Sequence, residues 1–114
     1  MAPKRNPKKL NKLQLKTLAI LQGFAETDIA SPGENDGEVQ LRQIPRPHGD
    51  HFHVAKGIVM TRDATGLFNR GVWAALERKG LMHSGVFPLR SILTAEGIDY
   101  DTGVKEQIIY TSDH

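Results

Sequence analysis

The stretch from Asn69 to Leu81, NRGVWAALERKGL, contains the signals that decide the fold. Asn69 belongs to the residue types that cap helix N-termini, and Gly80 belongs to the type that ends helices in a left-handed conformation. These signals predict a short helix over residues 70–79, with its start and its end both defined.

The same helix predicts an outward face. If Val72 and Leu76 face the core, Arg70 and Trp73 lie on the opposite side of the helix. Asn69 and Arg70 stand at the start of this helix. We therefore expect Arg70 and Trp73 to be offered to a partner.

A longer helix is predicted near the N-terminus, at about residues 11–26. Asn11 is a suitable N-cap, and apolar residues follow it at helical spacing. The width of this apolar face indicates that the helix is the central member of the core. The apolar positions are Leu10, Leu13, Leu15, Leu18, Ile20, Leu21, Phe24 and Ala25.

Two segments between these helices have strand character. Residues 39–44 and 51–59 alternate apolar and polar side chains, and a turn rich in proline and glycine separates them. We expect them to pair as a β-hairpin. The preceding segment, residues 27–38, is polar and rich in Gly, Asp and Glu, which predicts a mobile loop.

The second half of the chain predicts a short helical turn at residues 62–66, the helix described above, and a further hairpin. Leu81 and Met82 begin one strand, and residues 90–93 form the return strand. Polar and turn-forming residues between these strands are typical of a wing. Thr94 caps a final helical turn.

This order of elements resembles the winged helix-turn-helix family of DNA-binding proteins, of the MarR-like and ArsR-like kind. Four motifs carry the resemblance: LQLKTLAIL in the first helix, ATGL before the helix at 70–79, ALERKGLM at the end of that helix, and LTAEG after the wing. The resemblance covers residues 10–100. It implies an α+β fold with a three-helix core, a C-terminal β-wing and, in this chain, an inserted β-hairpin at about residues 39–59.

The resemblance also implies a function. We expect a small transcriptional regulator that binds double-stranded DNA, without enzymatic activity, and that forms a homodimer because one short helix covers only a half-site. The alternative is a winged-helix protein–protein interaction module that does not bind DNA. The residues expected to contact DNA are Arg62, Asn69, Arg70, Trp73, Lys79 and Arg90.

Charge is unevenly distributed along the chain. Residues 1–12 hold five Lys and Arg residues and no acid, while the whole chain has a formal net charge of +2. Subtracting +5 from +2 leaves −3 for the rest. We expect a disordered basic arm at residues 1–9, a winged-helix domain at 10–100 and a polar, partly disordered tail at 101–114.

Several classes of protein are disfavoured by composition. The chain has no cysteine, which excludes disulfides and thiolate metal sites. No apolar run reaches membrane-spanning length, and Lys12 and Lys16 interrupt the only leucine-rich segment near the N-terminus. We therefore expect a cytoplasmic protein without a membrane partner. Neither a Gly-x-Ser-x-Gly elbow nor a phosphate-binding Gly-rich loop with Lys-Ser/Thr occurs.

The segment PHGDHFH contains three histidines in the order His-x-x-His-x-His, which resembles the zinc-binding histidine triads of some streptococcal surface proteins. In a strand, His51 and His53 point to the same face, about 7 Å apart. A turn at Gly49 would fold His48 towards them. Three neutral imidazoles suit Zn²⁺, so the pattern also predicts a zinc-dependent sensor.

Two interpretations of this segment remain open. In the first, the histidines bind Zn²⁺ and the fourth position is left to water, Asp50 or His83. In the second, the histidines form only the polar outer face of a hairpin whose inner face carries Phe52 and Val54. The two differ in whether the three imidazoles converge.

Overall fold

A computed structural model describes residues 6–55 and 57–111 of the chain. These residues form four α-helices, two short 3-10 helices and seven strands. The helices are α1 Lys12–Phe24, α2 Arg70–Arg78, α3 Ala95–Asp99 and α4 Lys105–Ile108, with the 3-10 helices η1 Thr61–Asp63 and η2 Thr65–Phe68. The strands are β1 Ala30–Pro32, β2 Val39–Leu41, β3 His51–Val54, β4 Gly57–Met60, β5 Met82–Val86, β6 Arg90–Leu93 and β7 Ile109–Tyr110.

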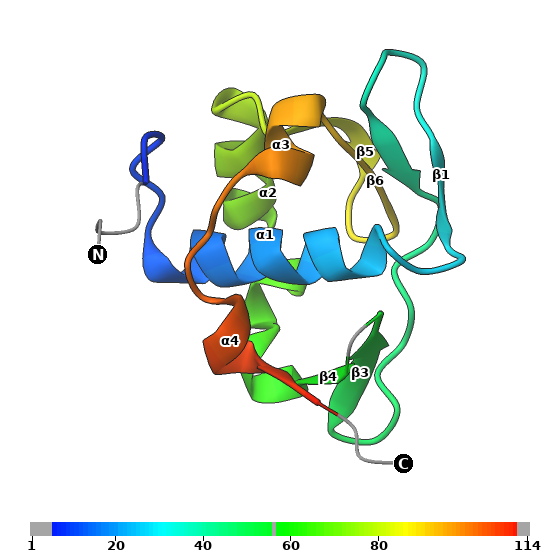
Figure 1. The fold of residues 1–114 in the computed structure, drawn as a ribbon, viewed down its shortest axis with the longest axis vertical. Coiled ribbons are helices and arrows are strands. Elements are labelled where there is room, and N and C mark those ends of the chain that lie inside the picture. Colours follow the sequence, from blue (N-terminus) through cyan, green and yellow to red (C-terminus); the bar gives the residue numbers. More distant parts are fainter. Residues whose placement is uncertain (1–5, 56, 112–114) are drawn as a thin grey trace.

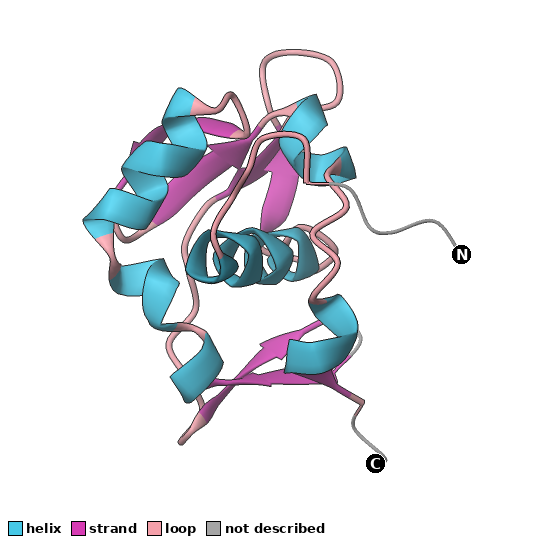
Figure 2. Ribbon diagram, turned by 90° about the vertical axis from the view of Figure 1, so that its left-hand side faces the viewer, coloured by secondary structure: helices cyan, strands magenta, loops and turns pink. Residues whose placement is uncertain are grey.

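The predicted N-terminal helix is α1, and its position at the centre of the molecule is confirmed. Asn11 and Gln14 form a capping box, because each side chain accepts a hydrogen bond from the other residue's backbone N–H. Every residue from Thr17 to Phe24 is buried. Figures 1 and 2 show α1 running between two sheets, one on either side of it.

The larger sheet has four antiparallel strands in the order β1-β2-β6-β5. Its centre is the pairing of β2 with β6, in which Gln40 lies opposite Ile92. Helix α2 contacts β5, and α3 contacts β6. This sheet and its helices cover one side of α1 (Figure 2).

The smaller sheet has three antiparallel strands in the order β3-β4-β7. Phe52 lies opposite Val59, and both side chains are buried, with exposed fractions of 1% and 0%. The Phe52 ring packs edge-on against Phe24 of α1, with ring centroids 6.1 Å apart. The inner face of this sheet is therefore fixed to α1.

The predicted winged helix-turn-helix architecture is wrong, although the α+β class is right. The segment expected as the second core helix forms only the 3-10 turns η1 and η2. The expected wing, β5 with β6, does not stand alone, because β6 also pairs with β2 and β2 pairs with β1. The structure therefore has four α-helices between and around two sheets instead of a three-helix core with a C-terminal wing.

The predicted hairpin of residues 39–44 with 51–59 is also wrong. Residues 39–41 pair with β1 and β6, and the hairpin consists of β3 with β4. Between these segments the chain passes from one sheet to the other. Ile44 anchors the crossing, because its N–H donates to the Leu89 carbonyl oxygen at 2.7 Å and its side chain is buried.

The two ends of the described chain make specific contacts with the body. The Tyr100 hydroxyl donates to Asn6 Oδ1 and accepts a hydrogen bond from the Lys8 N–H at 3.0 Å. Strand β7, where we expected a polar tail, pairs with β4 through Ile109 and Tyr110. The remainder of the expected basic arm, residues 1–5, lies outside the described residues, as do residues 112–114.

Helix α2 does not present the face that its spacing suggested. Val72 and Leu76 are buried as expected, but Trp73 is buried too, with 3% of its surface exposed. The Trp73 indole N–H donates to the Leu67 carbonyl oxygen at 3.1 Å. The Phe87 ring meets the indole edge-on, with ring centroids 5.1 Å apart. Packing of the β5–β6 turn against α2 therefore widens the buried face of this helix.

We predict that Trp73→Ala lowers the free energy of unfolding by about 3–5 kcal/mol, the range for a large buried aromatic side chain. Urea denaturation followed by circular dichroism measures this loss. Phe68→Ala is the control, since Phe68 is 54% exposed, and it should cost much less. Equal losses in the two variants would contradict the burial of Trp73.

Candidate metal centre

The candidate site lies on the outer face of the β3–β4 hairpin. Strand β3 alternates strictly, because Phe52 and Val54 are buried while His53 is exposed and His51 is half-buried. Since successive side chains of a strand point to opposite faces, His51 and His53 share the face that points away from α1. The strand therefore places two imidazoles side by side, as the sequence predicted.

A tight turn brings the third histidine to the same place. Gly49 has a φ of +73°, which glycine adopts at little cost. The turn lets the His48 N–H donate to the His51 carbonyl oxygen at 2.6 Å. His48 and His51 thus form a bridge that extends the hairpin by one residue pair.

The three imidazoles converge. One ring nitrogen from each of His48, His51 and His53 lies within 4.8 Å of the other two. The closest pair is His48 Nδ1 and His53 Nε2, at 3.3 Å. Nitrogens bound to one tetrahedral Zn²⁺ at about 2.0–2.1 Å lie about 3.3–3.4 Å from each other. The distance between His48 Nδ1 and His53 Nε2 is therefore already close to that between two nitrogens bound to one such ion.

Asp50 lies next to His51 and orients it. Its Oδ1 lies 3.1 Å from His51 Nδ1. The hydrogen bond from His51 lowers the pKa of the Asp50 carboxyl below its ordinary value of 3.8, so this carboxyl is ionised at neutral pH and accepts the Nδ1 proton. That tautomer leaves His51 Nε2 with its lone pair free to bind a metal ion, as in many carboxylate–histidine–metal sites. Asp50 thus orients His51, whereas the sequence had offered Asp50 as one candidate for the fourth ligand.

His83, the other residue considered for the fourth position, belongs to a different cluster. It lies on β5, and its Nε2 is 2.8 Å from Glu38 Oε2. Only 8% of the Glu38 side-chain surface is exposed. Within the described ranges, the group of side chains close enough together to hold a metal ion consists of His48, His51 and His53.

Glu38 is held by two neighbours. Asn35 donates to it through its backbone N–H at 3.2 Å and through its side-chain amide at 3.0 Å. The side-chain hydrogen bonds from Asn35 and then from His83 lower the pKa of the Glu38 carboxyl below its ordinary value of 4.5. The Glu38–His83 pair ties the β1–β2 loop to β5, so we interpret it as a structural contact.

Three of the residues expected to contact DNA make contacts within the protein instead. Asn69 caps α2, since its Oδ1 accepts a hydrogen bond from the Val72 N–H at 3.2 Å. The Arg70 guanidinium lies 4.6 Å from the centre of the Phe87 ring. The Lys79 ammonium donates to the Lys8 carbonyl oxygen at 2.6 Å.

The three remaining residues differ in exposure. Arg62 and Arg90 are both exposed, but they come from η1 and β6 and not from one helix face. Trp73, buried beneath Phe87, is not available to a partner. The structure therefore does not assemble the six residues into one reading surface. Local sequence patterns do not predict that Phe87 covers Trp73, because this contact depends on the path of the turn between β5 and β6.

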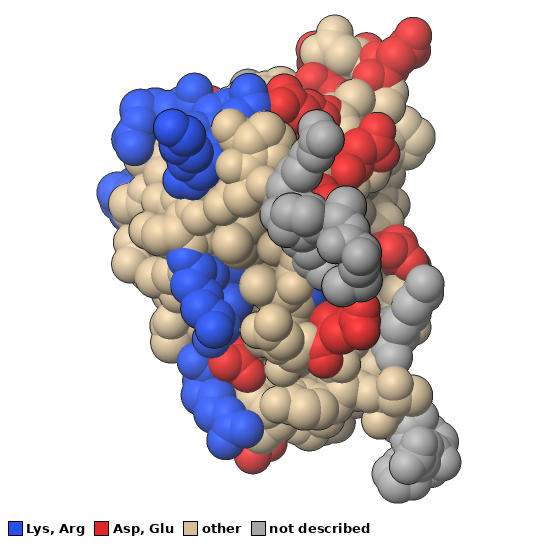
Figure 3. Space-filling view, turned by 60° about the vertical axis from the view of Figure 1, so that its left-hand side comes forward, with Lys and Arg blue, Asp and Glu red and all other residues tan. Residues whose placement is uncertain are grey.

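Basic side chains nevertheless gather on one side of the molecule. Figure 3 shows Lys and Arg along one edge of this view and most of the Asp and Glu side chains on the other. The Lys16 ammonium lies 3.1 Å from Asp63 beside Arg62, and α1 contacts α2. We use the term basic face for the cations of α1, of η1 and of the C-terminal end of α2, which are Lys12, Lys16, Arg62, Arg78 and Lys79.

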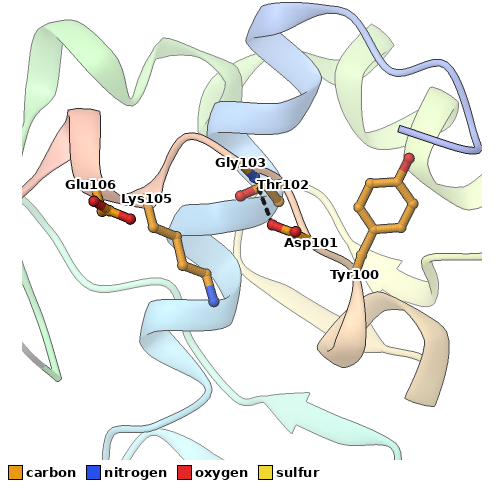
Figure 4. A pocket seen from close by; sticks show the side chains of 6 residues that line it. All are labelled: Tyr100, Asp101, Thr102, Gly103, Lys105 and Glu106. Atoms are coloured by element: carbon orange, nitrogen blue, oxygen red, sulfur yellow. Dashed lines mark hydrogen bonds between the residues drawn. The ribbon is translucent and has the colours of Figure 1, made fainter. Parts of the chain in front are cut away.

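A small hollow beside α4 does not bring its side chains together in the way that the hairpin brings the three histidines together (Figure 4). Its volume is about 170 Å³. Asp101 accepts a hydrogen bond from the Gly103 N–H at 3.1 Å, which is a local turn contact. The hollow is lined by Tyr100, Asp101, Thr102, Gly103, Lys105 and Glu106.

Comparison of the chain with protein-family models, with curated proteins and with solved structures found no match. Across the described parts of the chain, no helix has the length and apolar character needed to cross a membrane. We therefore infer function from the geometry of the site itself.

The Glu38 pair generates a prediction about pH. Its lowered pKa means that the carboxylate stabilises the folded state fully above about pH 4.5, and that this stability is lost as pH falls through the lower, folded-state value. The melting temperature of the wild type should therefore exceed that of Glu38→Gln most clearly above pH 4.5. The excess should shrink at more acidic pH.

Asn35→Ala provides the matched variant, because it removes the side-chain hydrogen bond that contributes most to the lowered pKa of Glu38. In this background the Glu38 contribution should be smaller, and its loss on acidification should be complete at a higher pH than in the wild type. Melting curves recorded by circular dichroism between pH 3 and pH 7 test both expectations. A constant difference between wild type and Glu38→Gln across this range would refute the assignment.

Proposed function

We propose that this protein is a metal-binding protein that holds a transition metal ion, Zn²⁺ in the first instance, through His48, His51 and His53. The observation that carries the proposal is the convergence of one nitrogen from each imidazole to within 4.8 Å. Neutral imidazole is a preferred ligand of Zn²⁺ and of neighbouring transition metals.

The exposure of the site favours reversible binding. His48 and His53 are exposed and His51 is half-buried. Three protein ligands leave one position of a tetrahedral ion open to water, whereas structural zinc sites use four protein ligands and are closed. A site of this kind suits a sensor or a carrier that gains and releases its metal ion.

Binding would also fix a local conformation. His48 comes from the turn, whereas His51 and His53 come from β3. A metal ion that joins them would fasten the turn to the strand, in addition to the His48–His51 backbone hydrogen bond. Because a ligand that binds only the folded state shifts the folding equilibrium, metal and stability are linked.

We predict that Zn²⁺ raises the melting temperature of the wild type and not that of His51→Ala/His53→Ala. At 100 times the dissociation constant, binding to the folded state contributes about 2.7 kcal/mol. Differential scanning calorimetry with and without Zn²⁺ measures the effect, and each variant is compared with its own metal-free melt.

His83→Ala is the control variant, since it removes a histidine that lies outside the triad. Its metal-dependent increase should match that of the wild type. Asp50→Asn should keep the stoichiometry but weaken affinity about 10–100-fold, the usual cost of losing a carboxylate that orients a ligating histidine. An equal increase in the wild type and in the double histidine variant would overturn the triad assignment.

The charge distribution supports a second candidate function, the binding of double-stranded DNA. The supporting observation is the gathering of Lys and Arg side chains along one edge of the molecule (Figure 3). Lys and Arg side chains bind phosphates without reading sequence, and such binding weakens steeply as salt is added. If the protein binds DNA in this way, it would act as a transcriptional regulator in the form of a homodimer, as the sequence suggested.

We predict that Arg62→Ala/Arg78→Ala weakens duplex binding and lowers the slope of log affinity against log salt by about 2, roughly one for each phosphate that the variant no longer neutralises. Fluorescence anisotropy with a labelled duplex at several salt concentrations measures this. Arg42→Ala/Arg46→Ala removes the same charge outside the basic face and should have a smaller effect. If both double variants behave alike, or if no duplex binds, a protein-interaction module is favoured over a DNA-binding one.

A further inference from the structure

Met60 lies directly opposite His51 on the neighbouring strand. Strands β3 and β4 are antiparallel, and their register pairs His51 with Met60 and Phe52 with Val59. Residues directly opposite in such a pair point to the same face, with Cβ atoms about 4.5–5.5 Å apart. Because Phe52 and Val59 point inward and are buried, Met60 shares the outer face with His51.

The surroundings of Met60 leave its side chain available. Met60 is half-buried, and among the described residues it belongs neither to the buried core nor to the partly buried side chains packed against it. A methionine side chain has three rotatable bonds and adapts readily to its neighbours. From the position opposite His51, its sulfur can therefore turn towards the three imidazoles.

A thioether changes which metal ion the site prefers. Zn²⁺ in proteins is held by imidazole, thiolate and carboxylate groups, and its fourth position in an open site is filled by water. The soft thioether of methionine favours copper(I), which imidazole nitrogen also binds. A site with three imidazoles and one thioether therefore discriminates between these ions through its fourth ligand.

We propose that Met60 is the fourth ligand of the hairpin site and that it gives the site a preference for copper(I). This inference rests on the proposed metal-binding function of His48, His51 and His53 and adds the identity of the ion. Zn²⁺ uses the three imidazoles and a water molecule. Copper(I) uses the three imidazoles and the Met60 sulfur.

Two affinities in two variants test the proposal. Copper(I), kept reduced by ascorbate without oxygen, is titrated in competition with bathocuproine disulfonate, and Zn²⁺ is titrated in competition with a chromophoric zinc chelator. Met60→Leu removes the sulfur at nearly constant volume. Met82→Leu removes a sulfur from the core, where Met82 is buried on β5.

The expected result is specific to one ion and one variant. Met60→Leu should weaken copper(I) binding at least about tenfold, because losing a ligand atom costs no less than losing a group that orients one. Its Zn²⁺ affinity should not change, and Met82→Leu should behave like the wild type with both ions. Unchanged copper(I) affinity in Met60→Leu would overturn the proposal.

The outcomes for the wild type separate this inference from the function on which it rests. If the wild type binds Zn²⁺ but not copper(I), the role of Met60 is refuted and the metal site stands. If it binds neither ion, the metal site itself is refuted, and the inference with it.

A measurement on the wild type avoids any effect of substitution on folding. Silver(I), a redox-inert stand-in for copper(I), is added to protein labelled with ¹³C at the methionine methyl groups. The Met60 methyl resonance should move on binding, whereas that of Met82 should stay. A Met60 resonance that does not move while the histidine resonances shift would overturn the proposal.

Discussion

The burial of one helix between two sheets is the constraint on which the rest of the structure depends. The last two turns of α1 are buried on every side, so each sheet must supply a face that covers them. Phe24 meets Phe52 on one side, and the Gln22 amide donates to the Gly97 and Tyr100 carbonyl oxygens on the other. An apolar helix surrounded in this way fixes the inward face of β3, and therefore its outward face.

Local signals in the sequence were sufficient for much of the secondary structure. Asn11 and Asn69 cap helices as expected, and strand period predicted which side chains of β3 face inward. Pairing between distant segments was not predictable in the same way. The polar segment of residues 27–38 contains β1, and the β5–β6 hairpin is part of a larger sheet because β6 pairs with β2, which also pairs with β1.

The histidine cluster followed from local sequence, whereas the surroundings of Met60 and Trp73 depend on contacts between separate segments. The three histidines lie within six consecutive residues, so strand period placed His51 and His53 on one face and a turn at Gly49 offered a way to bring His48 beside them. The position of Met60 opposite His51 depends on the register between two strands, which periodicity alone does not determine. The prediction for Trp73 was wrong for a similar reason, since the Phe87 ring that covers it comes from a separate hairpin.

The strand order of the smaller sheet has a consequence for how the molecule is made. A two-stranded hairpin is only marginally stable in water, and the third strand here is β7, which follows β4 by most of the second half of the chain. On the ribosome, the histidine-bearing strand emerges long before β7 is synthesised. The three histidines of the hairpin are therefore made before the sheet that carries them is complete, and their final arrangement comes late in biogenesis.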